Sequence, residues 1–183
     1  MVVLSGSNSS LLASQLAESL GWKHHALETR RFPDTEGYTR IPEEIIDDVR
    51  SEPVVLVSNT FPDAGIIETL LMLEAINDVR SGSMENLREI GPQQLPDVGV
   101  GILLAIPYFG YSRQDKRFKP GEAISARAIG QLLASRCDGI IVFDLHAPKV
   151  LEDLSVPVAF TSAMPELAKH LQETVAPDFI LSP

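Results

Sequence analysis

The sequence has a single cysteine, no long apolar run and no excess of positive charge. One cysteine, Cys137, cannot form an internal disulfide. A membrane-spanning helix needs roughly 18 consecutive apolar residues, and polar residues 5–7 follow the apolar start at once, so we expect neither a spanning helix nor a signal peptide. The net charge of −10 argues against general nucleic-acid binding, which requires a broad basic face. Together these absences predict a soluble cytoplasmic protein.

The patterning that is present predicts an α/β fold. The 183 residues are 44% hydrophobic and 22% charged, enough for one large domain or for one domain and part of another. Continuous apolar runs alternate with helical stripes, which favours a mainly parallel sheet with helices on both faces. We expect strands near residues 2–4, 24–30, 53–58, 98–106, 139–143, 156–160 and 178–181, and helices near 12–20, 66–73, 123–133 and 162–175. Residues 81–97 are expected to form a long surface connection.

A cationic loop follows the apolar run that ends at Ile106. Four cations and one carboxylate fall within residues 113–119, although the protein as a whole is acidic. Ligands of open parallel sheets bind beyond the carboxyl ends of the strands, and arginine and lysine both bind phosphate oxygens. A charged run is usually a solvated loop. The aromatic segment 108–111 before this one, and its charge opposite to that of the protein, favour a polyanionic ligand such as a nucleotide triphosphate.

Asp144 and His146 follow another buried strand, at 139–143. Because they lie two residues apart, their side chains can face the same way. They could bind a divalent ion, hold a phosphate or form a structural Asp–His hydrogen bond, and the spacing does not distinguish these roles. Magnesium prefers oxygen ligands, so His146 would be an unusual direct ligand.

Residues 30–41 predict a projecting hairpin, because Pro33, Asp34 and Gly37 mark a turn between two short extended pieces. The segment carries two aromatic residues, two carboxylates and three arginines, which suits recognition or a subunit contact as well as a solvated loop. Just before it, His24 and His25 are neighbours on a strand and point to opposite faces. We therefore expect them at the rim of the sheet rather than together on a metal.

Three motifs resemble those of one enzyme family. Residues 106–116, Ile-Pro-Tyr-Phe-Gly-Tyr-Ser-Arg-Gln-Asp-Lys, look like the signature of ribose-phosphate pyrophosphokinases, and residues 116–125 resemble its archaeal branch. Residues 31–36, Arg-Phe-Pro-Asp-Thr-Glu, are similar to the family's Arg-Phe-Pro-Asp-Gly-Glu. Residues 144–147, Asp-Leu-His-Ala, match a third family motif. The motifs occur in the family order, and the chain is therefore similar to the N-terminal half of these enzymes.

The resemblance implies a reaction, a cofactor and an assembly. The family transfers the diphosphoryl group of ATP to the anomeric hydroxyl of ribose 5-phosphate with Mg²⁺, giving 5-phosphoribosyl 1-diphosphate and AMP. Its members contain two similar phosphoribosyltransferase-like domains and form dimer-based homo-oligomers, commonly hexamers. We expect residues 1–160 to form an N-terminal, phosphoribosyltransferase-like domain that binds ATP. Residues 161–183 are expected to start a second, similar domain, and most of that domain and most of the ribose 5-phosphate site are expected to be absent from this sequence.

The resemblance also assigns residues to roles. The expected ATP-binding residues, the first three of which would reach the adenine of a neighbouring subunit, are Phe32, Asp34, Glu36, Arg113, Gln114, Asp115 and Lys116. His146 and Asp144 would lie at the metal and the phosphates. No catalytic residue is assigned, because the family's catalytic basic residue is expected beyond Pro183.

Two features leave an alternative open. Thr35 stands where the family has glycine, and a β-branched residue resists positive φ, so the hairpin tip is expected to differ or the adenine contact to weaken. The missing half also suits a non-catalytic regulatory or associated subunit of such an enzyme. An ordinary phosphoribosyltransferase is disfavoured, because the sequence lacks the acidic phosphate-binding loop expected of that class.

Overall fold

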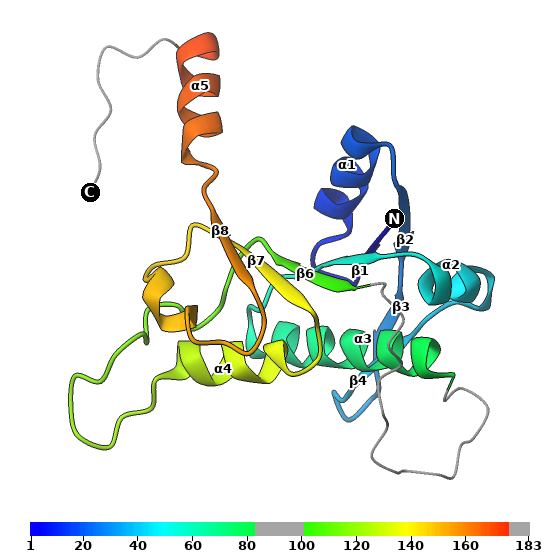
Figure 1. Ribbon diagram of the computed structural model, residues 1–183, viewed down its shortest axis with the longest axis horizontal. Helices are drawn as coiled ribbons and strands as arrows, with labels where there is room; N and C mark the ends of the chain where they lie inside the picture. Colours follow the sequence, from blue (N-terminus) through cyan, green and yellow to red (C-terminus); the bar gives the residue numbers. More distant parts are fainter. Residues whose placement is uncertain (83–100, 176–183) are drawn as a thin grey trace.

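The computed structural model describes residues 1–82 and 101–175. A six-stranded sheet in the order β2-β1-β5-β6-β7-β8 forms the body, every neighbouring pair is parallel, and β3 and β4 form a separate antiparallel hairpin (Figure 1). The strands are β1 Val2–Ser5, β2 Lys23–Ala26, β3 Glu28–Arg31, β4 Gly37–Arg40, β5 Val54–Val57, β6 Ile102–Ile106, β7 Gly139–Phe143 and β8 Val158–Thr161. The helices are α1 Ser10–Leu20, α2 Ile46–Ser51, α3 Asp63–Ser81, α4 Ser125–Ala134 and α5 Met164–Thr174, with short 3-10 helices at Glu43–Ile45 and Pro148–Leu151.

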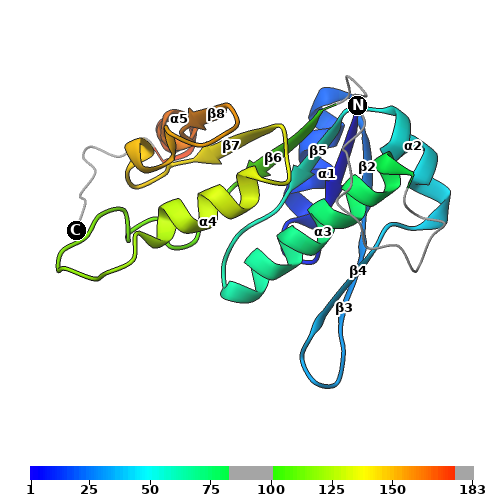
Figure 2. The same ribbon diagram turned by 60° about the horizontal axis from the view of Figure 1, so that its bottom comes forward.

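Helices cover both faces of the sheet. In Figures 1 and 2, α3 and α4 lie along one face and α1 lies on the other. This arrangement explains why the central strands are continuously apolar: all four residues of β1 and all four of β5 are buried. The predicted α/β fold, with a parallel sheet between two helical layers and a projecting hairpin, is confirmed.

The smaller apolar core lies between α1 and the sheet. The sequence pattern of α1 predicts an apolar stripe of leucines 12, 16 and 20 with alanines 13 and 17, and only part of this stripe is buried. Ala13 and Ala17 pack against the strands, Leu16 is partly buried beside them, and Leu12 and Leu20 are exposed. Alanine has no side chain beyond Cβ, so it lets the helix axis approach the strands closely, and the longer leucines are displaced to the flanks. The apolar pattern identified the helix but only part of its inward face.

The strand predicted over residues 24–30 is two strands. The buried Leu27, whose N–H donates to the Ser5 carbonyl (2.8 Å), separates β2 from β3, the first strand of the hairpin. The predicted opposite orientation of the two histidines is observed. His24 Nε2 lies 2.9 Å from Ser5 Oγ, whereas His25 Nε2 lies 3.1 Å from Asp48 on α2.

Several other boundaries differ from those expected. Helix α3 is longer than the predicted 66–73 and runs through Ser81, which we had placed in the connection that follows. Strand β6 begins at Ile102. Residues 83–97 of the predicted connection, the first residues of the strand predicted over 98–106 and the strand predicted over 178–181 lie outside the described residues.

The end of the described chain leaves the body of the protein. Strand β8 is an edge strand of the sheet, and α5 extends away from it with none of its residues buried (Figure 1). The predicted domain boundary at residue 160 falls one residue before the end of β8, and the assignment of 161–183 to a second domain remains a prediction. Within residues 1–82 and 101–175, no helix is long and apolar enough to cross a membrane.

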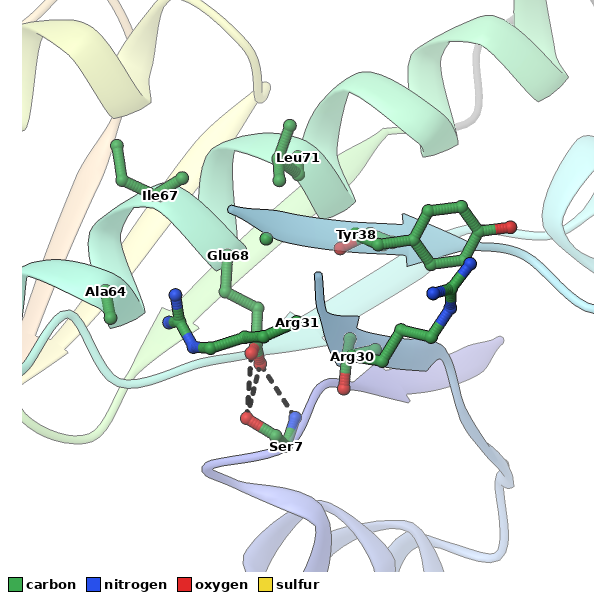
Figure 3. A pocket seen from close by; sticks show the side chains of 11 residues that line it. Ser7, Arg30, Arg31, Tyr38, Ala64, Ile67, Glu68 and Leu71 are labelled. Carbon is green, nitrogen blue, oxygen red and sulfur yellow. Dashed lines mark hydrogen bonds between the residues drawn. The ribbon is translucent and has the colours of Figure 1, made fainter. Parts of the chain in front are cut away.

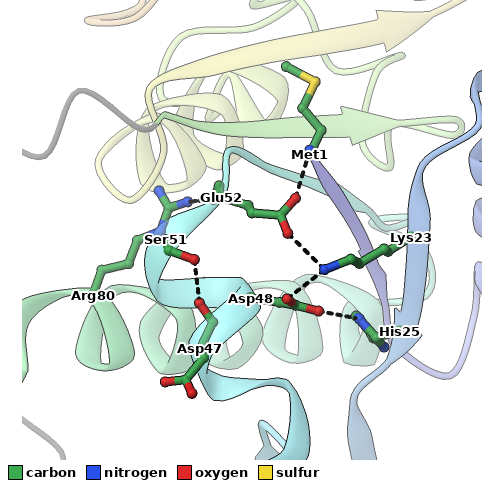
Figure 4. A network of polar contacts seen from close by, with 8 residues as sticks. All are labelled: Met1, Lys23, His25, Asp47, Asp48, Ser51, Glu52 and Arg80. Carbon is green, nitrogen blue, oxygen red and sulfur yellow. Dashed lines mark hydrogen bonds and ion pairs between the residues drawn. The ribbon is translucent and has the colours of Figure 1, made fainter.

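A charged network ties the amino-terminal ends of the strands to α2 (Figure 4). The Met1 amine lies 2.8 Å from Glu52, and Lys23 Nζ lies 2.7 Å from Asp48 and 2.9 Å from Glu52. The hydrogen bond from Lys23 lowers the pKa of Asp48, and the Met1 amine and Lys23 lower that of Glu52. The same carboxylates raise the pKa of Lys23. This network lies at the end of the sheet opposite to the candidate site.

Candidate functional site

Three polar segments meet at the carboxyl edge of the sheet. Parallel strands β5, β6 and β7 are neighbours, so the segments that follow them, 58–62, 107–124 and 144–147, leave the sheet on the same side. This is the edge at which open α/β sheets bind ligands. The structure thus brings the cationic loop and the Asp-Leu-His motif to one edge, as predicted.

We call residues 107–124 the signature loop. Its first part is fixed by the segment that follows β5. The Tyr108 N–H donates to Asn59 Oδ1 (2.9 Å), and the Thr60 N–H donates to the Tyr108 carbonyl (3.1 Å). The buried Gly110 N–H donates to Thr60 Oγ1 (2.8 Å). A Cβ at Gly110 would lie 2.2 Å from the Thr60 carbonyl oxygen, so only glycine allows this close approach.

Aromatic side chains make this base rigid. Phe109 is buried, and the rings of Phe61 and Tyr108 meet edge to face with centroids 5.7 Å apart. The Tyr111 hydroxyl donates to Asp63 Oδ1 (2.7 Å), which raises the pKa of Tyr111. Tyr111 also has a φ of 63°, a left-handed conformation that is sterically costly for a non-glycine residue. Its hydroxyl contact across the loops helps to hold that conformation.

Glu122 closes the outer part of the signature loop. Its carboxylate accepts hydrogen bonds from the N–H groups of Phe118 (2.7 Å) and Lys119 (3.0 Å), and its carbonyl accepts one from Arg117 Nε (2.8 Å). One of the four cations, Arg117, is therefore used to shape the loop. Such side-chain-to-backbone bonds limit the conformations of an exposed segment before any ligand binds.

Gln114 also supports the loop rather than pointing freely into solvent. Its side-chain Nε2 lies 3.5 Å from the Lys116 carbonyl and 3.4 Å from the Ala123 carbonyl. Its backbone carbonyl accepts a hydrogen bond from the Ala126 N–H (3.3 Å) at the start of α4. Arg113 differs from it. In the part of the chain that the structure describes, the exposed Arg113 guanidinium has no hydrogen bond or ion pair. Arg113 is therefore available to bind an anion.

Asp144 has a structural partner that the sequence did not suggest. Its carboxylate accepts hydrogen bonds from the Ser162 hydroxyl and from the Ala163 N–H (3.1 Å), just before α5. Its φ is 45°, again in the left-handed region. His146 is exposed, and no hydrogen bond joins it to Asp144 among residues 1–82 and 101–175. The Asp–His hydrogen bond considered as one possibility is therefore not formed.

The described residues offer an incomplete magnesium site. Among them, no group of three or more His, Cys, Asp or Glu side chains could hold a metal ion. Magnesium in phosphate-transfer sites takes one or two carboxylates and completes its octahedron with phosphate oxygens and water. Asp144 can supply one carboxylate, and it lies at the same edge of the sheet as the signature loop. These residues fit a magnesium ion only as an addition to phosphate ligands.

The hairpin residues predicted to bind adenine lie away from the signature loop. The Thr35 N–H donates to the Phe32 carbonyl, and the Glu36 N–H donates to Asp34 Oδ1 (3.1 Å), so the tip is an ordered turn. The Phe32 ring is partly exposed and lies 4.7 Å from the Arg30 guanidinium carbon. Figures 1 and 2 both show the β3–β4 hairpin and the signature loop at separate ends of the molecule. One chain therefore does not bring the two predicted parts of an ATP site together.

Thr35 tolerates the conformation that we expected it to resist. Its φ is 76°, so the threonine occupies the left-handed region usually taken by glycine. Arg31 donates to the Thr35 carbonyl (2.8 Å) and holds this peptide in place. Thr35 therefore adopts the positive φ that a β-branched residue resists, and both expectations, a different hairpin tip or a weaker adenine contact, remain predictions.

A pocket of about 250 Å³ lies at the base of the hairpin (Figure 3). Glu68 on α3 points into this region, and both of its carboxylate oxygens accept hydrogen bonds from Ser7. A Cβ at Gly6 would lie 2.3 Å from Glu68 Oε1, so this glycine makes room for the carboxylate. The hairpin residues predicted to bind adenine do not line this pocket. Ser7 and Glu68 pair with each other, whereas the buried Thr39 Oγ1 has no hydrogen-bond partner among the described residues. We assign the pocket no ligand.

A second pocket, of about 310 Å³, lies directly beside the signature loop. Asp115 and Lys116 line it, together with two cations that the sequence analysis did not single out, Arg127 and Lys149. Their only signal in the sequence is their position. Arg127 lies in the first turn of the helix after the loop, and Lys149 lies three residues after His146.

Comparisons with known proteins agree with the resemblance seen in the motifs. The sequence profile of the N-terminal domain of ribose phosphate pyrophosphokinase matches residues 1–86 and 100–136. A ribose-phosphate pyrophosphokinase of Methanothermobacter thermautotrophicus is 37% identical over 172 residues, which cover 93% of this chain and 53% of the relative. One of Methanopyrus kandleri is 34% identical over 175 residues, covering 94% and 52%.

A solved structure shares the fold. The crystal structure of phosphoribosylpyrophosphate synthetase from Mycobacterium smegmatis aligns with a TM-score of 0.69 at 23% identity, over 96% of this chain and 53% of that one. The chain spans about half the length of the curated relatives it matches.

Proposed function

Because the chain belongs to the ribose-phosphate pyrophosphokinase family, as a match to its N-terminal domain, we propose that it is the ATP-binding half of such an enzyme. In the proposed reaction the anomeric hydroxyl of ribose 5-phosphate attacks the β-phosphorus of ATP. The bond between the α- and β-phosphates breaks, AMP leaves, and 5-phosphoribosyl 1-diphosphate forms. The protein supplies positioning and electrostatic stabilisation and needs no nucleophile of its own. A cytoplasmic location is part of this proposal.

The observation that carries the proposal is a pre-shaped cationic loop at the ligand-binding edge of the sheet. The Gly110 contact and Glu122 hold the backbone, and the Arg113 guanidinium has no partner among the described residues. Arginine offers phosphate oxygens a planar fork, and lysine offers a point charge. Arg113 and Lys116 bind the triphosphate in this proposal, and Gln114 and Asp115 support the loop around them.

The residues at this edge would hold a magnesium ion together with the nucleotide phosphates. Bound to ATP, it would neutralise the charge that accumulates on the phosphate oxygens. Asp144 and His146 are the residues at this edge that would lie against the metal and the phosphates. Asp144 keeps its hydrogen bonds to Ser162 and Ala163 and orients its carboxylate through them.

The adenine would be held by a second copy of the chain. The hairpin and the signature loop lie apart within one chain, so a hairpin can complete the site only from a neighbouring subunit. Phe32 presents a partly exposed ring, stiffened by Arg30, and the exposed Asp34 and Glu36 stand beside it. This arrangement supports a dimer-based homo-oligomer, which in this family commonly extends to a hexamer.

The half-length match favours one further candidate. Residues 161–183 begin a second domain in our proposal, and the ribose 5-phosphate site belongs mostly to that domain. A chain without it could instead act as a regulatory or associated subunit of a complete enzyme. In that case the 183-residue chain would co-purify with a full-length homologue and alter its inhibition by nucleotides.

An assay of AMP release from ATP and ribose 5-phosphate tests the proposal. The 183 residues alone are expected to bind ATP but to release no AMP above background, because most of the sugar-phosphate site is missing. Adding the remaining half of a relative as a separate polypeptide is expected to restore release. Robust turnover by the 183 residues alone would show that the assignment of the sugar-phosphate site to another domain is wrong.

A further inference from the structure

Helix α5 is held against the body of the protein by one side chain, the carboxylate of Asp144. None of the residues of α5 is buried, and the helix rises from the end of β8 away from the sheet (Figure 1). Among residues 1–82 and 101–175, two hydrogen bonds tie residues 162–174 to the body, and no ion pair adds to them. Both bonds, from the Ser162 hydroxyl and from the Ala163 N–H (3.1 Å), end on Asp144.

Ser162 connects Asp144 to the first turn of α5. Its hydroxyl donates to Asp144 Oδ1, and the same hydroxyl oxygen accepts a hydrogen bond from the Met164 N–H (3.1 Å). The N–H groups of Ala163 and Met164 therefore reach Asp144 either directly or through Ser162. The first N–H groups of a helix have no partner within the helix and carry partial positive charge, so a carboxylate placed there stabilises the helix end. Asp144 is thus the anchor of α5.

The same carboxylate belongs to the proposed nucleotide site. Asp144 follows β7 at the carboxyl edge of the sheet, and its N–H donates to the Thr161 carbonyl (2.9 Å) at the end of β8. Each of its carboxylate oxygens accepts one hydrogen bond from the start of α5, which leaves each oxygen able to bind one more donor or a cation. Asp144 is exposed, so its side chain would rotate freely without these two bonds.

We infer that occupation of the nucleotide site and the orientation of α5 are coupled through Asp144, so that α5 is held in place when ATP and Mg²⁺ occupy this edge of the sheet. A carboxylate that is already fixed in one rotamer loses less conformational freedom when it binds a ligand. Linkage makes the coupling reciprocal: if an anchored α5 raises the affinity of the site, an occupied site favours the anchored α5 by the same factor. The inference rests on the proposed function, because it takes ATP with Mg²⁺ as the ligand of this edge.

Pulsed electron paramagnetic resonance on the full chain tests the inference, with nitroxide labels at Gln15→Cys on α1 and Lys169→Cys on α5. Both positions are exposed, whereas Cys137 is buried and its burial raises its pKa to about 11, so it escapes labelling. We expect the distribution of distances between the labels to narrow when saturating ATP and Mg²⁺ are added. Ser162→Ala should broaden the distribution in the free chain and reduce this narrowing.

Calorimetry on the same variants gives the reciprocal measurement. Ser162→Ala is expected to weaken binding of ATP with Mg²⁺ by about fivefold, at the low end for coupled sites because the bonds to Asp144 are exposed. Binding of ATP in EDTA should not change. Ser162→Thr keeps the hydroxyl and should restore both the affinity and the narrow distribution. Ser135→Ala removes an exposed hydroxyl that donates to the Leu132 carbonyl (2.7 Å), and as the matched control it should behave like the wild type.

Failure of the coupling and failure of the proposed function give different results. If the wild type binds ATP with Mg²⁺ and Arg113→Ala weakens that binding, but the distance distribution stays the same or broadens, the coupling is overturned and the proposed function stands. Equal affinity in the wild type and a folded Ser162→Ala variant also overturns the coupling alone. If the folded wild type binds no ATP, the proposed function is overturned and the coupling with it.

Discussion

Gly110→Ala tests whether the close approach of two loops sets the shape of the signature loop. The new Cβ would lie 2.2 Å from the Thr60 carbonyl oxygen and 3.1 Å from the carbon of the same carbonyl. Contacts under 3.0 Å are essentially never seen for a Cβ, and the obstructing atoms belong to the backbone of a buried residue, so the two segments must move apart.

The expected loss of stability follows from the contacts between the segments around Gly110 and Thr60. Overpacking a tight site costs about 1–3 kcal/mol. Separation also stretches the hydrogen bonds from the Gly110 N–H to Thr60 Oγ1 (2.8 Å) and from the Thr60 N–H to the Tyr108 carbonyl (3.1 Å), each worth about 1 kcal/mol. If both bonds are lost, we expect the free energy of unfolding to fall by about 3–5 kcal/mol.

Urea denaturation followed by circular dichroism measures this change. Gly101→Ala is the matched control, because a Cβ there would meet only the Asp138 side chain, at 3.6 Å or more. It should change the free energy of unfolding by less than about 1 kcal/mol. The reasoning is refuted if the two alanine variants unfold at the same urea concentration with the same slope.

Two further predictions concern regions outside the signature loop. Thr35→Gly should raise the free energy of unfolding by up to about 1 kcal/mol, because the left-handed conformation costs a non-glycine residue about 1–2 kcal/mol, partly offset by the entropy of glycine; a loss of stability in urea would contradict this. Stability should fall in acid. The pKa values of Asp48 and Glu52 are lower in the folded protein than their ordinary values of 3.8 and 4.5, so the two carboxylates stabilise the fold at any pH above those ordinary values. This contribution is lost as the pH falls through the lowered pKa values. Lys23→Ala should make urea midpoints less dependent on acid, and an unchanged dependence would exclude the network as the cause.

The sequence predicted the features that depend on local patterns. The run at 53–58 contains a strand because continuous apolar residues suit a sheet covered on both sides, and β5 occupies Val54–Val57. Turn residues predicted the hairpin for a similarly local reason. The position of the signature loop followed from a general rule about parallel sheets and needed only the strand before it.

Contacts between distant segments could not be predicted in this way. Gly110 lies against Thr60, fifty residues away, only because β5 and β6 are neighbours in the sheet. The role of Asp144 in holding the start of α5 depends on the pairing of β7 with β8. Both contacts require the strand order, which periodicity along the chain does not contain.

The pocket beside the signature loop, lined by Asp115, Lys116, Arg127 and Lys149, shows the same limit. Arg127 and Lys149 look like ordinary surface charges in the sequence, and nothing near them indicates a shared cavity. They meet because Gly130 allows α4 to pack closely on the segment after β7. The sequence therefore predicted the signature loop of the candidate site, but it did not predict which side chains lie beside that loop.

Calorimetric titration of the chain with ATP in the presence of Mg²⁺ tests the central claim, that the signature loop binds the nucleotide phosphates. We predict saturable binding that Arg113→Ala weakens by about 1–3 kcal/mol, as expected for lost charged hydrogen bonds, while Lys169→Ala leaves it unchanged. Absence of ATP binding by the folded chain, or equal affinity in the wild type and Arg113→Ala, would contradict the account.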